Sequence, residues 1–397
     1  MAGPGSDLIG DDELQEVIDV MKSGHLSRYG NLQDQNFRHK VYSFEKSFAS
    51  YCGAEFALAT SSGTASILIA LLALNLKPGD EVIVPTYTFV ATYSAIIFAG
   101  LVPVLTEIDE SLNMDPEKIE SRITPRSKVI MPVHMLGNPC DMAAIQTFAK
   151  RHGLFVVEDC CQSVGGSFRG KKVGTLGEIG AYSLNINKTI TTGDGGVVVT
   201  NEKKLYQRCF AIHDQGHSPF RGEVEIGKRS ILGLNFRMTE LSGAVALAQL
   251  RKIKTIIAEL KKKKNKFKDL IADVKELKFR KLNDPAGECG TLCTVIFEQK
   301  EKAEKVAKIL GTKTVDRSGW HVYANMEHIN NYLKEIGQPF GKGAYPITDD
   351  ILSRAINISI GVVDDGLGSG FGININSTEK EIADAAEKFC QACRQAS

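Results

Sequence analysis

Short apolar runs alternate with helical segments through the middle of this 397-residue chain. Residues 116–123 and 142–152 have the apolar spacing of amphipathic helices, and each lies between two runs that are typical of buried strands. Strands and helices that alternate in this way form a mostly parallel sheet with helices on both faces. The predicted strands are residues 81–85, 102–106, 128–133, 154–158, 180–184 and 196–200.

The α/β pattern continues on both sides of this region. Helices are predicted over residues 11–23, where apolar residues recur at helical spacing, and from Ser62 to Leu74. A long helix is predicted over residues 239–268, followed by strands at 291–297 and 356–360 and a helix at 300–310. We therefore predict a large domain over residues 1–254 and a smaller C-terminal α/β domain over residues 255–397, which includes the connecting helix.

Composition excludes several classes of partner. The net charge of +1 gives no reason to expect nucleic acid, and the four lysines Lys261–Lys264 are predicted to form a solvated helix face. No apolar run approaches the roughly 18 residues of a membrane span, so no membrane partner is expected. The first residues lack the basic and apolar regions of a secretory signal.

The nine cysteines do not form a recognisable framework. Their number is odd, and no pair is followed by a second pair at the spacing of a zinc site, so no metal is predicted. Reduced thiols in a cytoplasmic protein explain this pattern best. Cys160 and Cys161 are expected to pack beside the active site without reacting.

Two residues carry the strongest chemical signal. Asp159 ends the apolar run Leu154-Phe-Val-Val-Glu-Asp159, and Lys188 follows 29 residues later in a turn. Open α/β sheets bind ligands at the ends of such strands. An enzyme that uses pyridoxal phosphate needs a lysine to hold the cofactor as a Schiff base, and a carboxylate to keep the pyridine nitrogen protonated. The pair therefore indicates a site for this cofactor.

Several short motifs, in a fixed order, resemble the DegT/DnrJ/EryC1/StrS family of sugar aminotransferases. The resemblance is dense over residues 8–260 and looser towards the C-terminus. It implies the fold type I architecture of pyridoxal-phosphate enzymes, with a mostly parallel central sheet in the large domain and a smaller C-terminal α/β domain. The matching segments are Ser61–Ala65, Val84–Thr92, Glu158–Gln162, Ser183–Lys188, Thr191–Gly196 and Gly233–Met238.

The resemblance also implies roles for individual residues. Lys188 carries the cofactor and moves the proton, and Asp159 pairs with the pyridinium nitrogen. Asn235 is expected to reach the cofactor phosphate of the neighbouring subunit, which implies a homodimer with shared active sites. The other implied cofactor residues are Gly63, Thr64 and Ser183 at the phosphate, Phe89 stacked on the ring, and Gln162 beside the ring hydroxyl.

Other readings of the same residues stay open at this stage. Asp159 could form a structural salt bridge, Phe89 could be an ordinary core residue, and Ser62 and Thr64 have the chemistry of helix caps. Further substrate-facing residues suggested by the resemblance are His213, Arg237 and His321.

The family has members with different activities. Leu184 and Asp194 replace the usual Phe and Glu, which are conservative changes, and relatives that dehydrate sugars have histidine in place of Lys188. Transamination of a keto or aldehyde sugar, with glutamate as donor, is therefore the predicted function. The alternatives are dehydration and a regulator that binds the cofactor without turnover.

The substrate within the family is a separate prediction. Residues 233–240, 248–257 and the Trp320-His-Val-Tyr323 segment resemble enzymes that form 8-amino-3,8-dideoxy-manno-octulosonate for lipopolysaccharide. The alternative substrate is a nucleotide-linked 3- or 4-keto-6-deoxy sugar.

Overall fold

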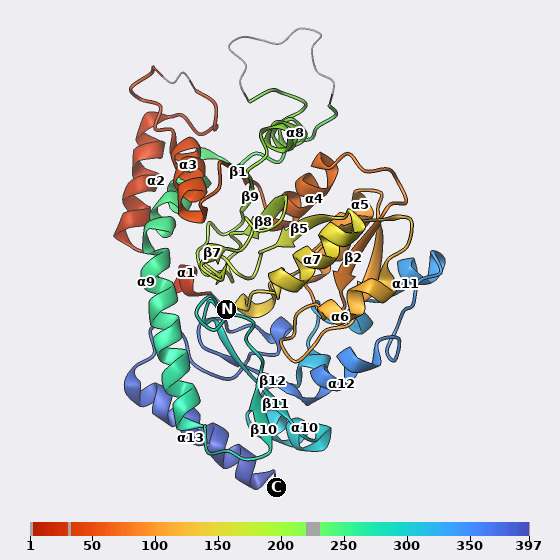
Figure 1. Ribbon diagram of the computed structural model, residues 1–397. Coiled ribbons are helices and arrows are strands. Elements are labelled where there is room, and N and C mark those ends of the chain that lie inside the picture. The colour runs from red at the N-terminus through yellow and green to blue at the C-terminus, as the bar shows by residue number, and fades with distance from the viewer. Residues whose placement is uncertain (1–2, 31–32, 220–230, 397) are drawn as a thin grey trace.

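A seven-stranded sheet organises the larger part of the fold in the computed structural model, which describes residues 3–30, 33–219 and 231–396 (Figure 1). The strand order is β1-β9-β8-β5-β4-β2-β3, and β9 runs antiparallel to both neighbours whereas the other pairs are parallel. The predicted α/β class is confirmed. The strands are β1 (Phe56–Thr60), β2 (Glu81–Pro85), β3 (Val102–Thr106), β4 (Ser127–Ile130), β5 (Phe155–Asp159), β8 (Ile179–Ser183) and β9 (Gly196–Thr200).

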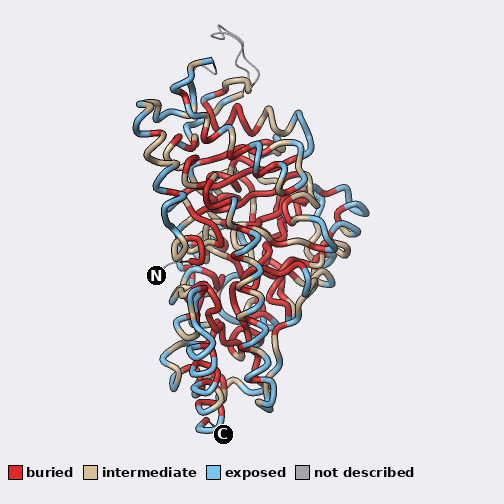
Figure 2. Tube along the Cα trace, turned by 90° about the vertical axis from the view of Figure 1, so that its left-hand side faces the viewer, coloured by how far each residue is buried: buried red, intermediate tan, exposed pale blue. Residues whose placement is uncertain are grey.

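Helices cover both faces of the sheet because its strands are apolar on both sides. In β9, Val198 packs with Ile67 and Phe210 in one core cluster, whereas its neighbours Val197 and Val199 belong to another. Buried residues accordingly follow one another through the interior of the described part of the chain (Figure 2). One face packs against α4 (Gly63–Ala73), α5 (Val90–Phe98) and α8 (Lys203–His213), and the other against α3 (Lys40–Cys52), α6 (Pro116–Ile119), α7 (Met142–His152) and α9 (Glu240–Leu270).

A three-stranded antiparallel sheet forms the lower part of the molecule (Figure 1). Its central strand β11 pairs with β10 and β12. Helix α10 packs against β11 and α13, and α13 packs against α9. The elements are β10 (Leu277–Phe279), β11 (Leu292–Phe297), β12 (Ala355–Ser359), α10 (Lys300–Ile309), α11 (Glu327–Glu335), α12 (Pro346–Arg354) and α13 (Glu379–Gln395).

The helix α9 is 31 residues long and continues without interruption through the predicted domain boundary at residue 254. It contacts α2 (Asp11–Ser23) and α3 near one end and α13 near the other. The division at residue 254 remains a prediction. The prediction that Lys261–Lys264 is a solvated face is wrong at Lys264, which is buried and ion-paired with Glu288 at 2.7 Å.

Predicted elements with a clear apolar pattern agree with the structure. Strands β2, β3 and β9 and the helices α2 and α7 have the predicted bounds. The strand predicted at 128–133 ends at Ile130. Pro132 has no N–H to continue the ladder, and Val133 forms only an isolated bridge with Asp159. Among the described residues, no helix combines the length and apolar character needed to cross a bilayer.

Candidate active site

A cavity of about 680 Å³ lies at the carboxyl ends of several parallel strands of the large sheet. Segments 313–321 and 362–367 of the C-terminal part close its other side. Ligands bind at this edge in open α/β sheets. The predicted site residues that line the cavity are Gly63, Thr64, Phe89, Asp159, Gln162, Ser183, Lys188 and His321.

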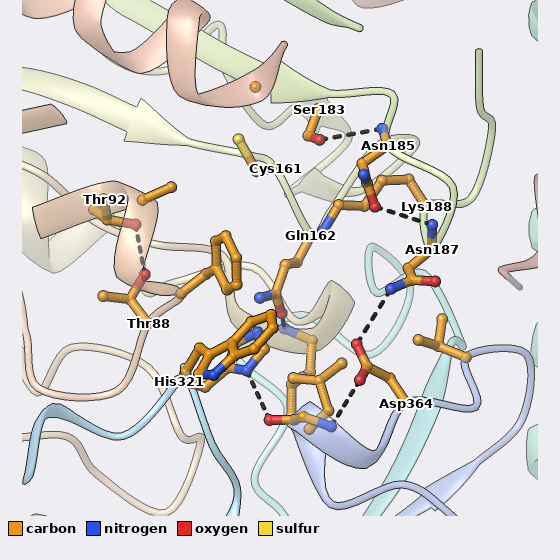
Figure 3. Close-up of a pocket in the computed structure, with 18 of the residues that line it drawn as sticks. Thr88, Thr92, Cys161, Gln162, Ser183, Asn185, Asn187, Lys188, His321 and Asp364 are labelled. Carbon is orange, nitrogen blue, oxygen red and sulfur yellow. Dashed lines mark hydrogen bonds between the residues drawn. The ribbon is translucent and has the colours of Figure 1, made fainter. Parts of the chain in front are cut away.

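Lys188 reaches into this cavity from the turn that follows β8, as Figure 3 shows. The turn is closed by a bond from the Thr192 N–H to the Leu184 carbonyl at 2.9 Å. Burial lowers the pKa of the Lys188 amine because the charged form loses hydration, although Cys161, Asp159 and Asp364 favour that form. The lowered pKa increases the fraction of unprotonated amine, which is the form that adds to a carbonyl group.

Asp159 lies at the last position of β5 and is almost fully buried, with 3% of its surface exposed. Its Oδ2 accepts a hydrogen bond from the Thr92 hydroxyl at 2.8 Å, and its Oδ1 accepts one from the Cys161 N–H at 3.0 Å. In the part of the chain that the structure describes, no basic side chain forms an ion pair with Asp159, so the salt-bridge reading does not hold. A buried carboxylate held by neutral donors in a cavity fits a cationic ligand group.

The start of α4 offers donors to an anion. Ser62 caps this helix by accepting the Ala65 N–H at 3.1 Å. The N–H groups of Gly63 and Thr64, at the first two helical positions, have no acceptor within the helix and can bind an anion. The hydroxyl of Ser183 is close by: a Cβ on Gly63 would lie 2.9 Å from its Oγ. Glycine at position 63 therefore leaves room beside Ser183.

The aromatic wall of the cavity combines residues from both parts of the chain. Phe89 lies 5.1 Å from the His321 ring and 6.4 Å from the Trp320 ring, centroid to centroid. The Thr88 N–H donates to the His321 carbonyl at 2.9 Å, so the segments are paired through their backbones. Burial lowers the pKa of His321 to about 3, although its bond to the Gly366 carbonyl opposes this shift. His321 is therefore neutral at physiological pH.

Gln162 and the two adjacent cysteines lie differently around the cavity. Gln162 is held through its Oε1, which accepts the Leu136 N–H at 3.1 Å, and points into the cavity (Figure 3). Cys161 lines the cavity, whereas Cys160 is fully buried in the core beyond it. Burial raises the pKa of both thiols well above the ordinary range, so both favour the unreactive protonated form.

Beside β5, the side chains of His134, Glu158 and Cys160 lie close enough together to suggest a metal site. Their hydrogen bonds explain the arrangement without a metal ion. The His134 Nδ1 accepts the Cys140 N–H at 3.0 Å, so Nε2 carries the proton and donates to Glu158 at 3.0 Å. Glu158 also accepts three backbone N–H groups from segment 174–177. The cluster fixes the end of β5.

The structure does not bring His213, Asn235 and Arg237 to the cavity of their own chain. His213 is completely buried, with its ring nitrogens 3.0 Å from the Arg28 guanidinium and 2.8 Å from the Phe210 carbonyl. This geometry speaks against the predicted contact of His213 with substrate. Arg237 is ion-paired with Asp214. Asn235 is exposed.

Sequence reasoning missed other residues that line the cavity. Asp364 accepts a hydrogen bond from the Asn187 amide at 3.3 Å, next to Lys188 (Figure 3). The exposed residues Lys313 and Arg317 lie at the mouth of the cavity, where Trp320 is 66% exposed. Trp320 is the only tryptophan in the chain, and the sequence analysis used it only as part of a family motif and not as a cavity residue.

These groups together fit pyridoxal phosphate. The amine of Lys188, the carboxylate of Asp159, the aromatic face of Phe89 and the N–H groups at the start of α4 face one cavity. Each complements a different part of the cofactor: the aldehyde, the pyridinium nitrogen, the ring and the phosphate.

Comparison with known proteins agrees with this site. The model of the DegT/DnrJ/EryC1/StrS aminotransferase family matches residues 7–363. A GDP-perosamine synthase of Escherichia coli O157:H7 is 33% identical over 349 residues, which cover 87% of this chain and 89% of that protein. A second, from Caulobacter vibrioides, is 40% identical over 243 residues, and that alignment covers only 61% of this chain and 62% of the relative.

The fold agrees as well. An aminotransferase from Psychrobacter cryohalolentis superposes with a TM-score of 0.80 and 25% identity, covering 97% of this chain and 96% of that structure. The chain belongs to the DegT/DnrJ/EryC1/StrS aminotransferase family and is a pyridoxal-phosphate-dependent aminotransferase.

Proposed function

We propose that the protein transfers the amino group of glutamate to the carbonyl carbon of a nucleotide-linked keto sugar. The products are the amino sugar and 2-oxoglutarate: the sugar exchanges its carbonyl oxygen for an amino group, and glutamate exchanges its amino group for an oxygen. The observation that carries the proposal is the Lys188 amine beside the buried Asp159 carboxylate in one cavity. The nucleotide-linked substrate is proposed because two relatives are named GDP-perosamine synthases.

Pyridoxal phosphate, when bound, supplies an electron sink that allows a proton to leave the carbon bearing the amino group. Lys188 is proposed to hold the cofactor and then to move that proton, because its lowered pKa leaves the free amine able to act as a base. The Asp159 carboxylate, oriented by Thr92, keeps the ring nitrogen protonated. Retention of Lys188 argues against dehydration, and retention of Lys188, Asp159 and Ser183 together argues against a role in binding alone.

The remaining cofactor residues position the group. The N–H groups of Gly63 and Thr64 are proposed to bind the phosphate together with the Ser183 hydroxyl, where the start of α4 favours negative charge. Phe89 is proposed to stack on the ring, and Gln162 to face its hydroxyl. His321 is proposed to touch substrate as a neutral side chain.

The mouth of the cavity supports a nucleotide-linked substrate. Lys313 presents positive charge there, Arg317 is ion-paired with Glu304 at 2.7 Å, and the Trp320 ring is exposed. Cationic side chains suit a diphosphate, and an exposed indole offers a flat face on which a base can stack. The octulosonate substrate suggested by three sequence segments gains no support from the relatives described above.

We also propose a homodimer in which each cavity is completed by the partner. Asn235 is exposed away from its own cavity, and the adjacent Leu234 and Leu232 are 61% and 97% exposed. Exposed apolar side chains next to a polar residue of a cofactor motif suit a subunit interface. The cytoplasm remains the proposed location, because no disulfide forms among the described residues.

A mass-spectrometric assay tests this proposal. Glutamate and the loaded enzyme are incubated with keto sugars that carry a nucleoside diphosphate, with the same sugars lacking it, and with the 8-oxo form of 3-deoxy-octulosonate. We expect amination and matching 2-oxoglutarate formation with a nucleotide-linked sugar only. Lys188→Ala should abolish both products, whereas the exposed control Lys171→Ala should retain them. Amination of the octulosonate alone would contradict the nucleotide-linked assignment.

A further inference from the structure

Residues 3–7, which we call the N-terminal brace, lie against the turn that carries Lys188. Residues Pro4–Asp7 of the brace form the short helix α1, and Gly3 precedes it. The Gly3 N–H donates to the Ile186 carbonyl at 3.0 Å, and the Gly5 N–H donates to the Lys188 carbonyl at 3.3 Å. The brace is therefore in direct contact with the backbone of the lysine.

The contact is too close for side chains at positions 3 and 5. A Cβ on Gly3 would lie 2.4 Å from the Asn187 carbonyl carbon and 2.8 Å from the Lys188 carbonyl oxygen. A Cβ on Gly5 would lie 2.7 Å from the Ile190 Cα. Gly3 has φ −91°, which any residue adopts, so the requirement at this position is steric.

A buried glutamine fixes the far end of the same turn. Gln249 of α9 is completely buried, and its Oε1 accepts the Thr191 N–H at 3.3 Å. Its Nε2 donates to Oε1 of Glu13 at 2.8 Å, and Lys252 donates to Oε2 of Glu13 at 2.8 Å. The turn is thus connected through Gln249 to the long helix and to α2.

The brace also lies beside the opposite wall of the cavity. A Cβ on Gly361 would lie 2.8 Å from the Pro4 ring, and the next residue, Val362, lines the cavity. The brace therefore packs against both the Lys188 turn and the 361–364 segment, which are also joined directly by the Asn187–Asp364 hydrogen bond.

We propose that the N-terminal brace and Gln249 are positioning elements for Lys188. Between Leu184 and Thr192 the chain has no helix or strand of its own, and the lysine amine lies at the end of a long side chain. Bonds to Ile186, Lys188 and Thr191 fix that backbone from outside and so direct the amine into the cavity. This inference rests on the proposed role of Lys188, whereas the contacts are present in the structure whatever the function of the lysine.

The first test compares alanine substitutions at two glycines of the brace with one at Gly10, which lies outside it. Gly3→Ala and Gly5→Ala force the turn to shift, whereas Gly10→Ala places its Cβ where nothing lies within 4 Å. We expect kcat to fall by about ten- to a hundred-fold in the first two, because such losses follow a displacement of about 1 Å. KM for glutamate should stay at the parent value, and Gly10→Ala should match the parent throughout.

The second test needs neither cofactor nor turnover. Amide hydrogen exchange of the apoprotein is followed for peptides covering residues 184–192. Exchange there should be at least about ten-fold faster in Gly3→Ala and Gln249→Met, which lose a bond to the turn. Arg251→Met is the matched control, since Arg251 lies on the same helix and binds Glu16 at 2.7 Å, away from the turn.

The outcomes separate the two proposals. Parent-level exchange and kcat in Gly3→Ala and Gln249→Met would overturn the positioning role, as would equal losses in the Gly10→Ala and Arg251→Met controls. If Gly3→Ala does not fold, Gln249→Met decides alone. If Lys188→Ala retains full turnover while exchange behaves as expected, the proposed function fails and the brace is a structural support of the turn.

Discussion

The hydroxyl of Thr92 on α5 donates a 2.8 Å hydrogen bond to Oδ2 of Asp159 at the end of β5. The two residues are 67 positions apart in the sequence, yet both are almost fully buried in the same cavity wall. Thr92 also lies 2.7 Å from the Thr88 hydroxyl, so the carboxylate is oriented through a chain of hydroxyl groups. This chain fixes the direction in which the Asp159 carboxylate points, and we propose that it points at the ring nitrogen of the cofactor.

Removing the charge of Asp159 should stop catalysis more than binding. Asp159→Asn keeps the shape of the side chain but cannot stabilise a cationic ring nitrogen, so most of the rate should be lost while weak cofactor binding remains. Thr92→Val should cost about ten-fold in rate, the effect of one lost hydrogen bond to a charged group. Stopped-flow measurements of the half-reaction with glutamate check both. Unchanged rates in Asp159→Asn would remove this residue from its proposed role.

Lys188 should limit the stability of the apoprotein in a way that depends on pH. Its pKa is lowered in the folded protein, so between that pKa and about 10.5 the unfolded chain binds more protons and stability rises with pH. Lys188→Met removes this dependence and should abolish turnover. The apoprotein variant should therefore melt higher than the parent at pH 7, with the difference shrinking towards pH 10. A constant difference would show that the amine is not desolvated.

His321 should weaken the fold in acid. Its pKa is about 3 in the folded protein against about 6.5 in an unfolded chain, so the unfolded chain binds more protons between these values. Stability is lost as the pH falls through that window. His321→Gln keeps a donor for the Gly366 carbonyl and removes the titration. Melting curves from pH 7 to pH 4 should fall less steeply for this variant than for the parent, while the exposed control His328→Gln should follow the parent.

The proposed shared site predicts complementation between inactive subunits. Asn235→Ala should weaken cofactor binding by about ten- to a hundred-fold, because a hydrogen bond to a charged group is worth about 1.5–3 kcal/mol. Mixing Lys188→Ala with Asn235→Ala subunits places both defects in one site and leaves the other site intact. Activity should therefore partly return after subunit exchange, as followed by the glutamate assay. No recovery after verified exchange would contradict the shared site.

The sequence predicted those parts of the fold that have a strong local pattern. Strand β2 and helix α7 have the predicted bounds because their apolar residues are bounded by Pro85 and by Asp141 and Gly153. The sheet order and the place of β9 could not be predicted, since they depend on pairings between distant segments. Helix α5 was missed because Val90–Phe98 is apolar on all sides, and periodicity is absent from such a segment.

In the candidate site too, residues marked by a local pattern were predicted, and residues that depend on distant contacts were not. Lys188 and Asp159 were predicted because strand ends and motifs mark them, and both line one cavity, although their roles stay predictions. Asp364 was missed because its partner Asn187 lies 177 positions away. The burial of His213 could not be predicted, since its contact with Arg28 joins residues 185 positions apart. Buried polar contacts between distant segments leave no periodic signal in the sequence.

The length of α9 limits how the cavity can open. Its 31 residues extend about 46 Å, and Gly243, near its beginning, is the only glycine along it. Without an interior proline or a glycine near residue 254, the helix offers no weak point where one half of the protein could swing away from the other. We therefore expect a substrate to enter through adjustments of short segments that line the cavity, such as 313–320. Rigid halves with a locally adaptable entrance would let relatives with the same framework accept different sugars.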